Sequence, residues 1–101
     1  MLTRELNLFH YGISTEEKNK LMELAKLEEN APLVRLSAGE SNPGLSDVLF
    51  QSLTTGATYY QLEKKTYIFA TKNDFYGYRR RALYIFKLLL KGREVEKTAK
   101  M

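Results

Sequence analysis

The pattern of hydrophobic and polar positions changes period along the first third of the chain. In residues 6–13, apolar side chains would line both faces of an extended segment, which is typical of a strand covered on both sides. Ser14 and Glu17 then have the spacing of a capping box, and apolar residues follow at three- and four-residue steps. A helix is therefore predicted over 15–29. Pro32 disfavours helical geometry in the residue before it, and we expect the helix to end at this break.

The middle of the chain predicts a strand, a loop and a second helix. Leu33 to Ser37 has the composition of a short strand, and Ala38 to Gly44 is the most turn-prone stretch, so it is predicted as a loop. Asn42 and Pro43 suit the N-cap and first turn of a helix that Gly56 terminates. The apolar face of this helix is traced by Leu45, Val48, Leu49 and Leu53.

Residues 58–71 are rich in tyrosine, threonine and β-branched residues, which favour strands. They predict a hairpin with strands at Tyr59–Leu62 and Thr66–Ala70 and a turn at Glu63–Lys65. Gln61 to Lys65 would also tolerate a helix, which is the alternative for this segment.

The last helix is expected to begin at a cap on Asn73 or Asp74 and to end before Gly92. Apolar residues on neighbouring faces make its hydrophobic surface wider than one packing contact needs, so residues 75–90 are also predicted to form a homodimer contact. The main apolar stripe is formed by Phe75, Tyr78, Ala82, Ile85, Phe86 and Leu89.

The order strand, helix, strand, helix, hairpin, helix predicts an α+β fold in which three helices pack on a short sheet. A chain of 101 residues has the size of one domain with one core. We assign this domain to residues 1–93. The polar stretch 94–101 is expected to be a frayed tail.

The absence of cysteine excludes disulfides, thiolate zinc sites and cysteine nucleophiles, and it fits an intracellular, cytoplasmic location. The N-terminus has no basic stretch followed by an apolar core and a cleavage site, and no apolar run has the length that spans a bilayer. A soluble protein without a membrane contact is therefore expected.

The net charge of +4 is unevenly distributed. Residues 1–60 carry five Lys and Arg against eight Asp and Glu, which gives −3, whereas residues 61–101 carry eleven against four, which gives +7. Such asymmetry indicates a polyanion, with DNA or RNA first, or an acidic protein surface. A basic face that only keeps the protein in solution is the alternative.

Within the basic third of the chain, cations alternate with aromatic residues. Nucleic-acid sites use this mixture, because cations neutralise phosphates and flat rings stack on bases. The alternative is a solvated basic face over core tyrosines. The predicted nucleic-acid-binding residues are Lys64, Lys65, Lys72, Tyr76, Arg79, Arg80, Arg81 and Lys87.

The glycine-rich loop before the second helix is a candidate anion-binding site, because free backbone N–H groups at a helix start attract anions. Its residues match neither the dinucleotide-binding fingerprint nor the phosphate loop with its lysine, and an ordinary loop would have the same composition. The residues of this candidate site are Gly39, Ser41, Asn42 and Gly44.

His10 is the only histidine and the natural general base at neutral pH. A single histidine in an apolar strand is more often structural, and scattered carboxylates would favour at most a hard cation such as magnesium. No catalytic residue, metal ligand or cofactor is therefore predicted.

Three functions follow from these patterns. The leading hypothesis is a non-catalytic protein that binds nucleic acid through the final helix and the preceding hairpin. The first alternative is an interaction or inhibitor protein that docks on an acidic partner, a role often filled by small proteins of viruses and mobile elements. The second alternative is a protein that binds or processes a nucleotide at residues 39–44.

Overall fold

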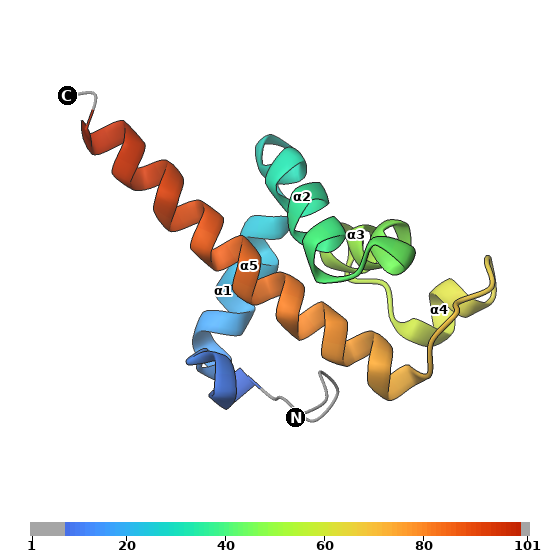
Figure 1. Ribbon diagram of the computed structural model, residues 1–101. Helices are drawn as coiled ribbons and strands as arrows, with labels where there is room; N and C mark the ends of the chain where they lie inside the picture. The colour runs from blue at the N-terminus through green and yellow to red at the C-terminus, as the bar shows by residue number, and fades with distance from the viewer. Residues whose placement is uncertain (1–7, 100–101) are drawn as a thin grey trace.

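Helical spacing of apolar residues governs the fold of residues 8–99, the part of the chain that the computed structural model describes (Figure 1). The α-helices are α1 (Thr15–Ala25), α2 (Ala31–Ser41), α3 (Ser46–Thr55), α4 (Tyr59–Glu63) and α5 (Lys72–Ala99). Short 3-10 helices are η2 (Leu8–Tyr11), η3 (Glu28–Asn30) and η4 (Pro43–Leu45). No strand occurs within residues 8–99. The predicted α+β fold with three helices on a sheet is therefore wrong, and this part of the chain is all-helical.

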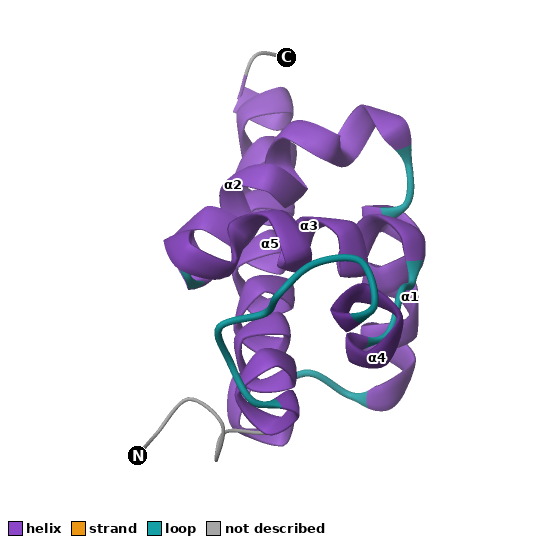
Figure 2. Cartoon of the chain, turned by 90° about the vertical axis from the view of Figure 1, so that its right-hand side faces the viewer, coloured by secondary structure: helices purple, strands orange, loops and turns teal. Residues whose placement is uncertain are grey.

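The long helix α5 organises the packing of the other helices. Its 28 residues span about 42 Å at the rise of an α-helix, close to the 47 Å longest dimension of the molecule. α1, α2 and α3 all contact α5, and α4 packs near its N-terminal end (Figure 1). Figure 2 shows in teal the long loop that leads from α4 back to the start of α5.

The buried side chains form two clusters along α5. The first contains Ile13, Leu21, Ala25, Val34, Leu53, Ala82, Leu83 and Phe86. The second contains Ala38, Leu45, Val48, Leu49, Tyr59, Leu62, Ile68 and Phe75. Phe50 is partly buried and packs against both clusters, so it links them into one core. The second cluster holds α4 and the loop after it in place.

Two of the predicted strands are helical. Of residues 6–13, Leu8–Tyr11 form η2, and Leu6 and Asn7 lie outside the described residues. Leu33 to Ser37 lies within α2. Pro32 does not break this helix because it occupies the first turn, where its missing N–H has no helical partner to lose.

The N-terminal cap of α1 is confirmed, but its predicted end at residue 29 is wrong. The Glu17 backbone N–H donates to the Ser14 hydroxyl oxygen at 3.1 Å. The helix ends at Ala25, and the side-chain amide of Asn30 donates to the carbonyl oxygen of Leu24 at 2.8 Å. This bond satisfies a carbonyl group that the end of a helix leaves without a helical partner.

The predicted loop at residues 38–44 is partly helical, since residues 38–41 form the last turn of α2. Asn42 caps η4 by accepting the Gly44 N–H at 3.0 Å, and α3 begins only at Ser46. The end of α3 at Gly56 is confirmed, because this glycine adopts a left-handed φ of 79°. The predicted apolar face is also confirmed by the burial of Leu45, Val48, Leu49 and Leu53.

The predicted hairpin is wrong, and the helical alternative describes its first half. Thr58 and Gln61 form a capping box in which the Thr58 N–H donates to Gln61 Oε1 at 2.9 Å and the Gln61 N–H donates to Thr58 Oγ1 at 3.2 Å. These bonds start α4 and bury Tyr59 and Leu62. Thr66–Ala70 has no strand partner and forms part of the loop to α5.

α5 begins at Lys72, before the predicted cap on Asn73 or Asp74, and it ends later than predicted. The Asp74 N–H donates to Thr71 Oγ1 at 3.2 Å, so the threonine side chain caps the first turn of α5. The helix continues through Gly92 to Ala99, and its predicted end before this glycine is wrong. Within the predicted stripe, Phe75, Ala82 and Phe86 are buried. The fraying of residues 94–101 stays a prediction.

Two glycine substitutions are expected to have opposite effects on stability. Gly56→Ala places a Cβ on a residue with a left-handed φ, which costs about 1–2 kcal/mol. Gly92→Ala adds a methyl group to exposed space inside α5 and is expected to stabilise the protein by about 0.4–1 kcal/mol. Urea unfolding followed by circular dichroism measures both changes. A loss of stability in Gly92→Ala would contradict the continuation of α5 through this position.

Among residues 8–99, no helix combines the length and the apolar composition that a membrane span requires. The cytoplasmic location stays a prediction.

Candidate nucleic-acid interface

Three of the predicted cations lie on one continuous segment at the end of the molecule that carries α4. Lys64 and Lys65 follow directly after α4, and Lys72 is the first residue of α5. Backbone N–H groups of Lys65 and Thr66 donate to the Leu62 carbonyl oxygen at 3.0 and 3.1 Å, which fixes how the chain leaves α4. The segment therefore presents its lysines from a defined backbone.

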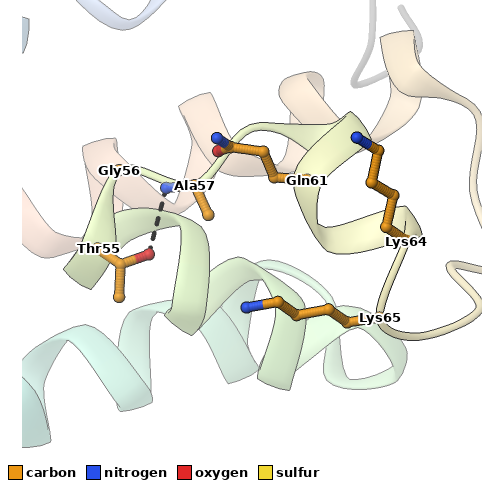
Figure 3. A pocket seen from close by; sticks show the side chains of 6 residues that line it. All are labelled: Thr55, Gly56, Ala57, Gln61, Lys64 and Lys65. Carbon is orange, nitrogen blue, oxygen red and sulfur yellow. Dashed lines mark hydrogen bonds between the residues drawn. The ribbon is translucent and has the colours of Figure 1, made fainter.

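Lys64 and Lys65 line a hollow between the end of α3 and α4, which we call the lysine hollow (Figure 3). Its volume is about 540 Å³, within the range of small-ligand sites. The left-handed turn at Gly56 and the cap on Thr58 create it by reversing the chain between the two helices. The lining residues are Thr55, Gly56, Ala57, Gln61, Lys64 and Lys65, none of which is acidic.

The polar groups around the lysine hollow are mainly hydrogen-bond donors. Gln61 Oε1 already accepts the Thr58 N–H, which leaves the amide NH₂ group of Gln61 to donate. In Figure 3 the Lys65 side chain extends across the hollow toward the Thr55 side. The Lys26 ammonium lies 3.8 Å from the position that a Cβ on Gly56 would take. This collection of cations and amide donors suits an anion such as phosphate.

The segment after the lysines exposes two aromatic rings. Tyr67 and Phe69 are 75% and 83% exposed, and their ring centroids lie 4.5 Å apart in an edge-to-face arrangement. Ile68, between them, is buried in the second core cluster. Because neighbouring side chains of an extended segment point to opposite sides, anchoring this isoleucine turns both rings outward.

Two further contacts stabilise the exposed aromatic segment. The Tyr59 hydroxyl donates to the Ala70 carbonyl oxygen at 2.9 Å, which ties the end of the segment to α4. The Lys72 ammonium lies 4.9 Å from the centre of the Tyr60 ring, which is itself 56% exposed. Residues 66–69 also border a second, smaller hollow of about 180 Å³ against residues 43–48. The segment thus connects hollows at both ends of α3.

Arg79 and Tyr76 are engaged within the fold. One Arg79 guanidinium nitrogen donates to Ser52 Oγ at 3.1 Å, and the guanidinium carbon lies 4.7 Å from the centre of the Tyr76 ring. Burial lowers the pKa of Arg79 from its ordinary value. The Tyr76 hydroxyl accepts the Tyr59 N–H at 3.0 Å. Both side chains therefore hold α5 against α3 and α4.

Arg80 and Arg81 lie on another side of α5, near η2. Burial raises the pKa of Tyr11, and the positive charges of Arg81 and Arg80 oppose this shift. Arg81 follows Lys72 by nine residues, so the two side chains leave α5 on sides about 180° apart at 100° per residue. Arg81 thus does not join the three lysines in one patch.

Lys87 is paired inside the fold. Its ammonium lies 2.7 Å from Glu17 Oε1 and 3.5 Å from the Gly12 carbonyl oxygen. The Lys87 side chain is only 16% exposed, so this ion pair joins α5 to α1 and is little accessible to a phosphate. Of the predicted nucleic-acid-binding residues, the structure brings together Lys64, Lys65 and Lys72.

Several residues at this interface were not assigned to the site from the sequence. The sequence predicts Phe69 in a hairpin strand, and the run of Tyr67, Ile68 and Phe69 does not show which of the three side chains is buried. Lys26 is far from the basic segment in sequence, and no pattern connected it to Gly56.

The candidate anion-binding loop uses its polar groups within the chain. Gly39 lies inside α2, the Ser41 hydroxyl donates to the Tyr78 carbonyl oxygen at 2.6 Å, and Asn42 accepts the Gly44 N–H. This geometry gives the anion-binding prediction no support. His10 is exposed on η2. Within the described range of the chain, no cluster of histidine and carboxylate side chains is suited to hold a metal ion.

Comparisons with protein-family models, with curated proteins and with solved structures found no match.

Proposed function

We propose that the protein binds nucleic acid, without catalysing a reaction, through a surface that we call the lysine–aromatic surface. This surface consists of α4, the loop at residues 64–71 and the first residue of α5. The observation that carries the proposal is the clustering of Lys64, Lys65 and Lys72 with exposed aromatic rings on one anchored segment. Cations that contact phosphates, next to rings that contact bases, are the combination that nucleic-acid binding needs.

The charges of this surface support the proposal. Residues 60–72 carry three lysines against one acid, Glu63. Among residues 8–99, none of the three lysines forms an ion pair. Their charges are therefore available to phosphates, in contrast to the charge of Lys87, which Glu17 neutralises.

Fluorescence anisotropy with short labelled DNA and RNA tests the proposal directly. We expect binding at ~50 mM salt that weakens steeply toward ~200 mM, because each phosphate contact releases counterions. Single strands and duplexes of both nucleic acids are titrated in parallel. Absence of binding to all of them at ~50 mM salt would reject the proposal and favour an acidic protein partner for the same surface.

The homodimer contact through residues 75–90 also stays a proposal. Much of the apolar surface of α5 is buried in the core, but Leu88 is 47% exposed. Sedimentation equilibrium on the purified protein distinguishes a monomer from a dimer.

A further inference from the structure

We infer that Tyr67 and Phe69 stack on unpaired bases, so that the lysine–aromatic surface selects single-stranded nucleic acid over duplex. This inference rests on the proposed function and specifies its ligand. Tyr67 is 75% exposed to solvent and Phe69 is 83% exposed. Large rings exposed in this way leave apolar area that a ligand can bury.

The backbone holds the two rings in place before any ligand arrives. Ile68 is 6% exposed and packs in the second cluster, and the bond from Tyr59 to the Ala70 carbonyl oxygen fixes the chain just beyond Phe69. Rings held in advance lose less conformational entropy on binding than rings on a freely moving loop. The segment is therefore suited to present a stacking surface.

The lysines next to the rings point to a polyanion as the occupant. Lys65 and Tyr67 are two residues apart, so their Cα atoms are separated by at most about 7.6 Å, twice the spacing of consecutive Cα atoms. The ring and the cation therefore start from one short stretch of backbone, and a single strand that follows this segment can contact both. A purely apolar peptide would leave these charges without partners.

The shape of the surface favours a single strand. In a duplex the base faces are already stacked on one another, and proteins usually read base edges by placing a helix or β-ribbon in a groove. Here the cations lie on a loop and at helix ends. Unpaired bases expose their faces and stack on aromatic side chains with little dependence on sequence.

The test compares the wild-type protein with the double variant Tyr67→Leu/Phe69→Leu, which keeps apolar bulk but removes both aromatic faces. We expect affinity for single strands to fall by roughly 5- to 150-fold for each ring that stacks on a base. The dependence of affinity on salt should stay unchanged, because no phosphate contact is lost. Both rings are exposed, so the melting temperature serves as the control for folding.

An abasic single strand of equal length supplies the matched ligand control, since it keeps the phosphates and lacks the bases. The wild-type protein is expected to bind it more weakly than the normal strand, and the double variant is expected to bind the two equally. Three results would overturn the inference and leave the proposed function standing. The wild-type protein could bind normal and abasic strands equally, it could bind duplex as tightly as single strands or more tightly, or the double variant could bind like the wild type. Absence of binding to any nucleic acid would contradict both the inference and the proposed function.

Discussion

Phe75→Ala is expected to lower the free energy of unfolding by about 3–5 kcal/mol. Phe75 is fully buried in the second core cluster, with its ring centroid 5.6 Å from that of Tyr59 and 5.2 Å from that of Tyr76. Its removal loses the transfer free energy of the ring and leaves a cavity. Since the free energy of unfolding of a small domain is about 5–15 kcal/mol, the expected loss is a large part of the total stability.

Phe69→Ala is the matched control for this prediction. The chemical change is the same, but Phe69 is 83% exposed, so stability should change by no more than about 0.5 kcal/mol. Urea unfolding followed by circular dichroism measures both variants. Similar losses in the two variants would contradict the assignment of Phe75 to the core and of Phe69 to the surface.

Phe75 also connects stability to the proposed function. Its cluster contains Tyr59, Leu62 and Ile68, which hold α4 and the aromatic segment in position. Partial loss of this packing should therefore weaken nucleic-acid binding even under conditions where Phe75→Ala remains folded. The first cluster, around Phe86, has no member in residues 59–72.

Neutralising Lys64, Lys65 and Lys72 together to glutamine is expected to weaken binding and to flatten its dependence on salt. Each phosphate contact on a single strand contributes about 0.7 to the slope of log affinity against log salt, so three contacts contribute about 2.1. Between ~50 and 200 mM salt, the loss of affinity should then be smaller by about 18-fold than in the wild-type protein. Anisotropy titrations at several salt concentrations measure this slope.

A second triple variant separates a defined interface from general charge. Lys18→Gln, Lys20→Gln and Lys91→Gln change the net charge by the same amount on α1 and on the distal half of α5. This variant should retain the wild-type slope. If both triple variants flatten the slope equally, the protein binds through its overall charge, and the lysine–aromatic surface is not a specific binding site.

The lysine variants and the aromatic variants test different contributions to the binding free energy. Loss of lysines changes the number of counterions released, whereas loss of aromatic rings lowers affinity at every salt concentration by a similar factor. The two sets together therefore separate phosphate contacts from base contacts.

Local signals predicted two of the helix ends correctly. The Ser14 cap of α1 and the left-handed Gly56 at the end of α3 are both present, because each depends on groups within a few residues. The capping box of Thr58 and Gln61 was equally readable in the sequence. The strand preference of the tyrosines around it predicts a hairpin instead, which the structure does not contain between residues 58 and 71.

The candidate site was predicted in part. Lys64, Lys65 and Lys72 are near one another because they are near one another in the chain, so the sequence sufficed to group them. Arg79, Arg80, Arg81 and Lys87 belong to the same basic third, but helical geometry and packing distribute them over different neighbours. Arg79 and Lys87 are held by contacts with residues far away in the sequence, Ser52 and Glu17.

The sequence by itself determined the charge asymmetry, the apolar face of α3, the cap of α1 at Ser14 and the end of α3 at Gly56, since these depend on composition and on local spacing. Tertiary structure decided that residues 33–37 are helical, because the buried face of α2 packs on α5. It also decided which charges reach solvent. Glu17 neutralises Lys87 and burial encloses Arg79, whereas the anchoring of Ile68 leaves Tyr67 and Phe69 exposed beside the free lysines.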